Sequence, residues 1–416
     1  MKRKATTPFR IISILLSGAM LLAVPAPCAA AEGGFACEIA EDWNALFDRR
    51  GRAVRSWLGA DGIYTVKTAE DRTVFLFSDT LIGRSDANGK PGGAAMANHS
   101  AALLRGGSPL PQNLAFYYGG QGKRRDAANL FGERYWLFDA VYLDGTLHIL
   151  AFTPGDNWKP LSVRNVRVPV RNGQPDFSRC VVDEPAPQLC RWTADGAYCY
   201  AFGQGITDNS ANDGYVYLYG YKDPLTSFES RDLIVSRIRR EDYGDFTQLR
   251  YWDGTGWCDE IERCADIAEN VSCEMSCTEI PSGAHKGRFL LVYMHACNSG
   301  RLMYALGDSP VGPFDEPVCF YTAPEKDAPA ANGKDTLYTY NAKAHPALSQ
   351  GETWLISYNV NSSGEQYTTD YHPRFLYLIL PGDFPSQTKN TPLLYSHLKA
   401  WLQGLTTMLL RFSAKH

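Results

Sequence analysis

A repeated pair of short β-rich segments constrains the fold of this 416-residue chain more than any other feature. In each pair, two runs rich in Val, Ile, Tyr, Phe and Leu flank a turn signal such as Asp144-Gly145, which is typical of β-hairpins. The pairs span 61–66 and 73–79, 139–143 and 146–152, 197–202 and 214–220, 274–280 and 288–293, and 345–348 and 353–358. The second strands centre near residues 76, 149, 217, 290 and 355, so the unit recurs about every 70 residues.

This regular spacing predicts an all-β, five-bladed β-propeller in a single domain, because each hairpin unit would belong to one blade. A β-sandwich would need no such regularity. Long apolar helical periodicity is absent before residue 394, which disfavours an α/β barrel. The net charge of −4 disfavours a nucleic-acid-binding protein, because such domains usually carry a basic excess.

The N-terminal residues predict export. Basic Lys2-Arg3-Lys4, a mostly apolar run at 11–24 and small residues at 29–31 together have the pattern of a secretory signal peptide over 1–31. We therefore expect the protein to be secreted or extracytoplasmic, at the cell surface or in the periplasm. The propeller domain is then expected over 32–390.

The C-terminal segment, 391–416, is predicted to be an amphipathic helix. Apolar residues between 394 and 410 recur at helical spacing and are flanked by Lys399 and Arg411. The run is too short and too interrupted to span a membrane comfortably. We expect it to pack on the domain, and peripheral membrane contact is the alternative.

Cysteine usage agrees with export. The chain has 11 Cys residues, and Cys28 falls within the predicted signal peptide, which leaves an even number. In an exported protein these residues are expected to be mostly paired in disulfides. A zinc site is the alternative for the cluster Cys258, Cys264, Cys273 and Cys277, although its spacing fits no common zinc pattern. No cofactor or metal is predicted, and no ligand spacing supports a structural calcium.

Acidic residues and one histidine occupy corresponding positions in the repeats. The start of the first strand and the end of the second lie at the same end of a hairpin, and in the first unit these positions hold Asp61 and Asp79. Two carboxylates at one mouth of the propeller's central channel can provide the acid and the base or nucleophile of glycoside hydrolysis. Other first strands begin with Asp139, Glu274 and His345, which are expected to bind substrate there. Each residue alone also fits a turn, an exposed acid or a structural histidine.

Four further polar residues are candidate sugar ligands. His99 lies in a predicted loop after the first hairpin, where a turn role is the alternative. Asn341 and Lys343 alternate with His345, so on a strand all three would face one side. Arg374 follows a proline and is expected to pair with a carboxylate or to close the last blade.

Several segments between about residues 50 and 380 carry a family resemblance: Trp57–Val66, Thr73–Thr80, Arg134–Val141, Asp308–Phe314, Tyr340–Pro346 and Ile356–Asn361. They resemble the five-bladed propeller glycoside hydrolases related to the bacterial endo-D-arabinanases, glycoside hydrolase family 183, and their relatives. The resemblance implies a catalytic pair at Asp61 and Asp79 and inversion at the anomeric centre. The chain departs from the family at Ser78, where glycine is frequent, and in its many cysteines.

The sequence thus predicts a secreted glycoside hydrolase that cleaves a cell-wall or extracellular polysaccharide with two aspartates in the propeller funnel. The resemblance implies the glycosidase class, and the polysaccharide can contain furanose or pyranose sugars, with an arabinofuranose-containing glycan as one candidate. The expected partner is a polysaccharide or oligosaccharide and not a nucleic acid. The alternative is a non-catalytic propeller that binds glycans or proteins at the cell surface, and such a protein would tolerate loss of Asp61 and Asp79.

Overall fold

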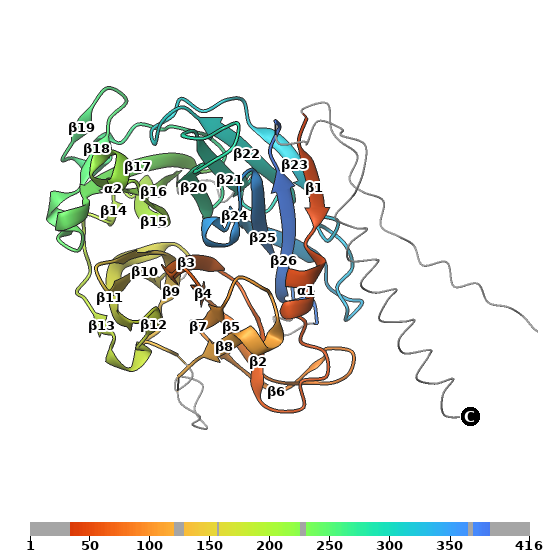
Figure 1. Cartoon of the computed structure of the whole chain (residues 1–416). Coiled ribbons are helices and arrows are strands. Elements are labelled where there is room, and N and C mark those ends of the chain that lie inside the picture. Colours follow the sequence, from red (N-terminus) through yellow and green to blue (C-terminus); the bar gives the residue numbers. More distant parts are fainter. Residues whose placement is uncertain (1–33, 120–128, 156–157, 225–229, 365–368, 383–416) are drawn as a thin grey trace, which may run out of the picture.

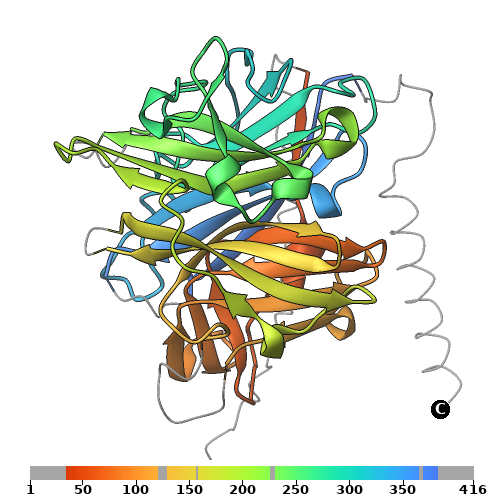
Figure 2. The ribbon, with the colours of Figure 1, turned by 90° about the vertical axis from the view of Figure 1, so that its left-hand side faces the viewer.

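Antiparallel sheets make up nearly all of the computed structural model (Figures 1 and 2). It describes residues 34–119, 129–155, 158–224, 230–364 and 369–382. Its α-helices there are the short α1 (Glu41–Leu46) and α2 (Ser210–Asp213). None of the helices in these ranges is long and apolar enough for a membrane span. The predicted signal peptide and C-terminal helix lie outside the described residues.

Five sheets follow one another along the chain, each wholly antiparallel. The first sheet contains β3 (Tyr64–Ala69), β4 (Arg72–Phe77), β7 (Ser100–Arg105) and β8 (Leu114–Tyr117). The second contains β9 (Trp136–Leu143), β10 (Thr146–Pro154), β11 (Pro160–Arg171), β12 (Gln174–Pro175) and β13 (Val181–Val182). The third contains β14 (Cys190–Trp192), β15 (Tyr198–Asp208), β16 (Tyr215–Pro224), β17 (Asp232–Arg239), β18 (Arg250–Trp252) and β19 (Trp257–Cys258). The last two contain β20 (Met275–Glu279), β21 (Phe289–Met294), β22 (Arg301–Gly307) and β23 (Val318–Thr322); and β24 (Leu337–Ala344), β25 (Thr353–Ser362), β26 (His372–Ile379) and β1 (Ala36–Ile39).

The five sheets are arranged around a common centre, in a propeller-type arrangement. One strand of each sheet, here called the inner strand, contacts the inner strand of the next sheet along the chain. Strand β3 contacts β9, β9 contacts β15, β15 contacts β20, and β20 contacts β24. The circle returns to the first sheet through the 3-10 helix η7 (Pro346–Leu348), which contacts β3. Strand β1 pairs with β26, so both ends of the described chain lie in the fifth sheet, as the adjacent red and blue arrows of Figure 1 show.

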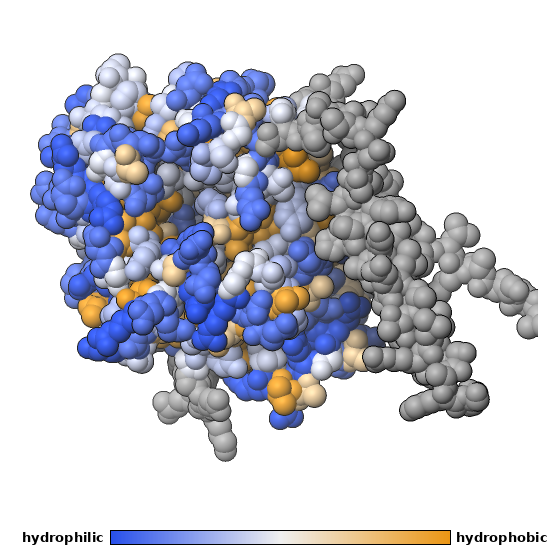
Figure 3. Space-filling view, in the orientation of Figure 1, coloured by the Kyte–Doolittle hydropathy of each residue, from blue (hydrophilic) through white to orange (hydrophobic). Residues whose placement is uncertain are grey.

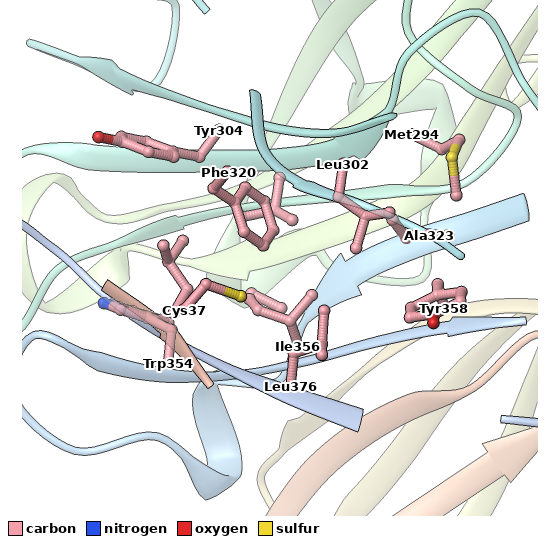
Figure 4. Close-up of a cluster of buried hydrophobic side chains, with 14 of the residues drawn as sticks. Cys37, Met294, Leu302, Tyr304, Phe320, Ala323, Trp354, Ile356, Tyr358 and Leu376 are labelled. Carbon is pink, nitrogen blue, oxygen red and sulfur yellow. The ribbon is translucent and has the colours of Figure 1, made fainter. Parts of the chain in front are cut away.

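Each sheet packs against a neighbouring sheet on both of its faces. Successive residues of a strand point to opposite sides, so each strand supplies side chains to both of these contacts. On β25, Trp354, Ile356 and Tyr358 pack against the fourth sheet (Figure 4), whereas Leu355 packs with Phe75 of the first sheet. Separate hydrophobic clusters fill the other spaces between neighbouring sheets. Burial of each large side chain contributes about 1.5–3 kcal/mol to folding, so these clusters hold the ring together. On the face shown in Figure 3, hydrophilic residues cover most of the outer surface, with hydrophobic patches toward the middle.

The structure confirms the second strand of all five predicted hairpins, as β4, β10, β16, β21 and β25. The predicted first strand of the last hairpin, 345–348, is wrong: these residues form His345 and η7, and the strand is β24 at 337–344. Pro346 explains the difference, because a proline lacks the N–H that a strand needs and suits the first turn of a helix. A small sixth sheet, not predicted, contains β2 (Ser56–Ala60), β5 (Thr80–Ser85) and β6 (Pro91–Ala97).

The predicted disulfide framework is not seen. Nine cysteines in the described ranges form no disulfide bond: Cys180, Cys190, Cys199, Cys258, Cys264, Cys273, Cys277, Cys297 and Cys319. The described residues also contain no group of three or more His, Cys, Asp or Glu placed to hold a metal ion.

Candidate active site

The turn structure of the first sheet brings Asp61 and Asp79 together. Asp61 precedes β3, Asp79 follows β4, and the backbone N–H of Asp61 donates to the carbonyl of Asp79 at 3.2 Å. The N–H of Ser78 donates to the Asp61 carbonyl at 2.9 Å. Gly62 makes this approach feasible: it has a φ of +59°, and a Cβ there would lie 2.6 Å from Ser78 Oγ.

A cavity of about 260 Å³ opens over this turn. Its described lining residues are three acids, several aromatic side chains and a few polar groups: Asp61, Ser78, Asp79, Trp136, Phe138, Phe152, Trp158, Tyr221, Arg231, Cys273, Glu274, Cys297, Asn298, Tyr338, Tyr340, Asn341 and Asn361. Convergent carboxyl groups in a concave, partly apolar site are typical of an active site.

Asp61 is set up to hold a proton. Burial first, and then the negative charges of Asp79 and Glu274, raise its pKa well above the ordinary value of 3.8. Tyr340 Oη donates a hydrogen bond to Asp61 Oδ2 at 3.0 Å, which opposes this rise only in part. A carboxyl that stays protonated can donate a proton to a leaving oxygen.

The Asp79 carboxyl accepts hydrogen bonds from two side chains. Trp136 Nε1 donates to Asp79 Oδ1 at 2.7 Å, and Asn98 Nδ2 donates to the same oxygen at 3.1 Å. Burial raises the pKa of Asp79, and these two hydrogen bonds oppose that rise by stabilising the carboxylate. The pKa of Asp61 is raised well above its ordinary value, so Asp61 is the better candidate for the acid and Asp79 for the base.

Glu274 lies in the same cavity, directly before β20, as part of a buried ion pair. Lys343 Nζ contacts Glu274 Oε2, and Asn341 Nδ2 donates to Oε1 at 2.9 Å. Burial raises the pKa of Glu274, and the Lys343 charge opposes that rise. A β-bulge follows Tyr340, where Asn341 has a φ of +59°, and both predicted ligands from β24 are engaged by Glu274.

Asp139 and His345 were expected at this mouth, but the structure places them elsewhere. Strand β9 begins at Trp136, so Asp139 lies inside the strand and lines a second cavity, of about 340 Å³. Its oxygens accept backbone hydrogen bonds from Ala140 and Ile206, both at 2.8 Å, and burial raises its pKa to about 7. His345 follows β24 and is fully buried, with its ring hydrogen-bonded to the hydroxyls of Thr65 and Ser357.

His99 and Arg374 also lie outside the described lining of the Asp61–Asp79 cavity. The His99 ring is fully buried, accepts a hydrogen bond from the Phe131 N–H at 2.8 Å, and contacts the Tyr135 carbonyl at 3.1 Å. Burial lowers the pKa of His99 to about 4. Arg374 donates to Glu325 Oε1 at 2.9 Å and lines a separate cavity beside α1. These contacts fit structural roles for both side chains.

The aromatic side chains that line the cavity were not predicted from the sequence. Trp136, Trp158, Tyr338 and Tyr340 line it but were not predicted as site residues. Strict strand alternation would place Tyr338 and Tyr340 on the face opposite Asn341, but the β-bulge after Tyr340 brings all three residues to the same cavity. Predicting this required both the correct strand, β24, and its bulge.

Solved structures show what the fold is similar to. A candidate hydrolase from Bacteroides ovatus matches with a TM-score of 0.63 and 16% identity, over 88% of this chain and 96% of that chain. Weaker matches include an exo-β-1,3-galactanase from Phanerochaete chrysosporium with bound β-1,3-galactotriose (TM-score 0.43, 8% identity, 83% of this chain and 64% of that chain). Another is the GH43_1 enzyme from Xanthomonas citri complexed with xylotriose (TM-score 0.38, 14% identity, 82% and 92%).

No curated protein matches the sequence. One family model does, over residues 41–378, which include all five sheets' inner strands and both aspartates of the cavity. The chain therefore belongs to the family described as the domain of unknown function DUF5005.

Proposed function

We propose that this protein is a glycoside hydrolase in which Asp61 is the general acid and Asp79 the general base. The observation that carries the proposal is the pair itself: two half-buried carboxyl groups on hydrogen-bonded backbone segments, in one cavity, with different hydrogen-bond donors. Different environments of this kind support a division of the two carboxyl groups into an acid and a base.

The reaction proceeds by a single displacement. Asp79 takes a proton from a water molecule, whose oxygen attacks the anomeric carbon, while Asp61 gives its proton to the glycosidic oxygen that leaves. The anomeric centre is inverted, as the family resemblance of the first-blade residues implies. Inversion needs the two carboxyl groups about 6.5–9.5 Å apart to admit the water. Proton NMR of the first product formed distinguishes the inverted from the retained anomer.

The remaining features of the proposal concern architecture and location. The five sheets around the centre are the blades of one five-bladed propeller. The protein is exported, on the basis of residues 1–31, and acts on a cell-wall or extracellular polysaccharide. The family resemblance makes an arabinofuranose-containing glycan the first substrate to examine.

The test is a screen of the purified protein on arabinan, arabinogalactan, xylan and galactan, with detection of new reducing ends. We expect hydrolysis of at least one polymer. Asp61→Asn and Asp79→Asn should lower its rate by about 10²–10⁴-fold. Asp71→Asn is the matched control, because Asp71 is exposed at the opposite end of the same hairpin. Binding of a polymer without hydrolysis by the wild-type protein would instead identify a non-catalytic glycan-binding propeller.

A further inference from the structure

One tryptophan at the cavity is unusually exposed. Trp158 lines the cavity, yet 54% of its surface remains accessible, whereas large apolar side chains are normally buried. Its backbone has a φ of +67°, which is rare for a bulky residue and costs conformational energy. An exposed indole held in a strained backbone conformation is unfavourable for folding alone, so a ligand-binding role is the simpler explanation.

Trp158 is connected to the proposed base through a second tryptophan. The Trp158 and Trp136 rings stack at 5.4 Å with an angle of 7° between their planes. Trp136 also packs edge-on against Phe152 and donates its N–H to Asp79 at 2.7 Å. The flat surface of the Trp158 ring is thus separated from the Asp79 carboxylate, the proposed base, by the Trp136 side chain.

The backbone beside Trp158 is firmly anchored. The next residue, Lys159, forms a buried ion pair with Asp223 at 2.8 Å, and Arg231 lies 3.2 Å from the same carboxylate. The Gly155 N–H donates to the Lys159 carbonyl at 2.8 Å, and the Trp158 N–H donates to the Gly155 carbonyl at 3.1 Å. A rigid aromatic side chain binds a ligand at a low entropic cost.

The charges of the cavity indicate which sugars suit this surface. Arg231 is the one basic residue among the described lining residues, and it already contacts Asp223 and the Cys297 thiol. Of the three acids that line the same space, Asp61 is the proposed proton donor and Glu274 is paired with Lys343, which leaves Asp79 as the negative charge that a ligand would meet. An acidic sugar would therefore be repelled by the Asp79 carboxylate, whereas an uncharged ring would not.

We propose that Trp158, supported by Trp136, is a stacking platform for an uncharged sugar ring bound next to Asp79. The apolar C–H face of a pyranose or furanose ring would cover the exposed indole and exclude water from the surroundings of the Asp79 carboxylate. This inference rests on the proposed function for its substrate class, but it concerns binding and not bond cleavage.

The experiment measures binding by calorimetry in an Asp61→Asn background, so that turnover does not interfere. The ligands are xylotriose, β-1,3-galactotriose and arabinotriose, with trigalacturonate as the acidic counterpart. We expect at least one neutral trisaccharide to bind, and trigalacturonate to bind at least about tenfold more weakly. Trp158→Ala should raise the Kd of the neutral ligand about tenfold, and Trp158→Tyr should recover part of that loss.

Leu161→Ala is the control, because Leu161 is equally exposed (59%) on the same hairpin but is not part of the described cavity lining. An unchanged Kd in Trp158→Ala, equal binding of trigalacturonate, or no neutral trisaccharide bound would each overturn the platform. Failure of the proposed function gives a different result: the wild-type protein would release no reducing ends while Trp158-dependent binding persists.

Discussion

The two cavities at the opposite ends of the inner strands are built differently. The Asp61–Asp79 cavity takes its residues from the beginnings of β9 and β24, and from just before β3 and β20. The second cavity takes residues from within and beyond the same strands, such as Lys67 on β3 and Ala347 after β24. Its described lining mixes aliphatic, hydroxyl and lysine side chains with two tyrosines, and Asp139 and Asp208 are the carboxyl groups among them.

An unusual pKa is not sufficient to identify a catalytic carboxyl. Burial raises the pKa of Asp139 to about 7, but its two oxygens accept hydrogen bonds from the backbone N–H groups of Ala140 and Ile206. Asp61 and Asp79 also have raised pKa values, but they share one cavity with aromatic walls, and the charge of Asp79 contributes to the raised pKa of Asp61. Shared access to the cavity, together with different hydrogen-bond donors, distinguishes the pair.

The largest expected effect separates the two cavities by activity. Asp139→Asn should leave turnover of the polysaccharide within about threefold of wild type, while Asp61→Asn and Asp79→Asn lower it by orders of magnitude. The reason is that Asp139 lies outside the Asp61–Asp79 cavity and its oxygens accept hydrogen bonds from two backbone N–H groups. Initial rates on one polymer provide the measurement, with circular dichroism as the check on folding. A loss in Asp139→Asn as large as in Asp61→Asn would reverse the assignment.

The next effect concerns stability at the boundary between the cavities. Glu274→Gln leaves the Lys343 ammonium buried and unpaired, since only 2% of the Lys343 side chain is exposed. The free energy of unfolding should fall by about 3–5 kcal/mol, and adding Lys343→Met should restore much of it. Denaturant titration measures both variants.

The exposed pair Arg191–Glu262 supplies the control for this prediction. Its atoms are 4.0 Å apart and both side chains are 51% exposed, so Glu262→Gln should change stability by less than about 1 kcal/mol. Equal losses in Glu274→Gln and Glu262→Gln would show that the buried pair has no special role.

A smaller effect tests whether the hydrogen bond from Trp136 lowers the pKa of Asp79. Trp136→Phe keeps an aromatic ring but removes the N–H that donates to Asp79, so the pKa of Asp79 should rise. Because the base must be ionised, the acidic limb of the kcat/KM profile should move to higher pH. Trp192→Phe is the control, because the Trp192 N–H donates to a backbone carbonyl at 2.9 Å. An unmoved acidic limb in Trp136→Phe would argue against Asp79 as the base.

The sequence predicted the hairpins well because strand alternation and turn residues are local signals. It failed where distant segments or backbone details decide the structure. The pairing of β1 with β26 joins residues more than 300 positions apart, and no local pattern indicates it. Asp139 and His345 were predicted at the wrong place because the starts of β9 and β24 were predicted wrongly. Where a strand starts and ends decides which of the two cavities a residue can reach. His99 looked like a loop residue, but its ring is enclosed by Phe131 and Tyr135.

The smallest expected effect is a pH-dependent change in stability. The pKa of Asp61 is raised on folding, so its protonated form is favoured in the folded state and its ionisation destabilises the fold. Asp61→Asn should therefore raise the Tm by on the order of 2 °C. The gain should be absent below pH 3.8, grow as the pH rises toward the raised folded pKa, and level off above it. Thermal melts across that range check this, and a constant difference would contradict it.

The most direct test of the Asp61–Asp79 pair compares two leaving groups. An aryl glycoside with an acidic phenol, such as a 2,4-dinitrophenyl glycoside of the sugar identified in the screen, needs no proton from a general acid. Asp61→Asn should cleave this substrate at a rate near that of wild type while failing on the polysaccharide, whereas Asp79→Asn should fail on both. If Asp61→Asn is impaired equally on the two substrates, Asp61 is not the general acid and the proposed division of roles is wrong.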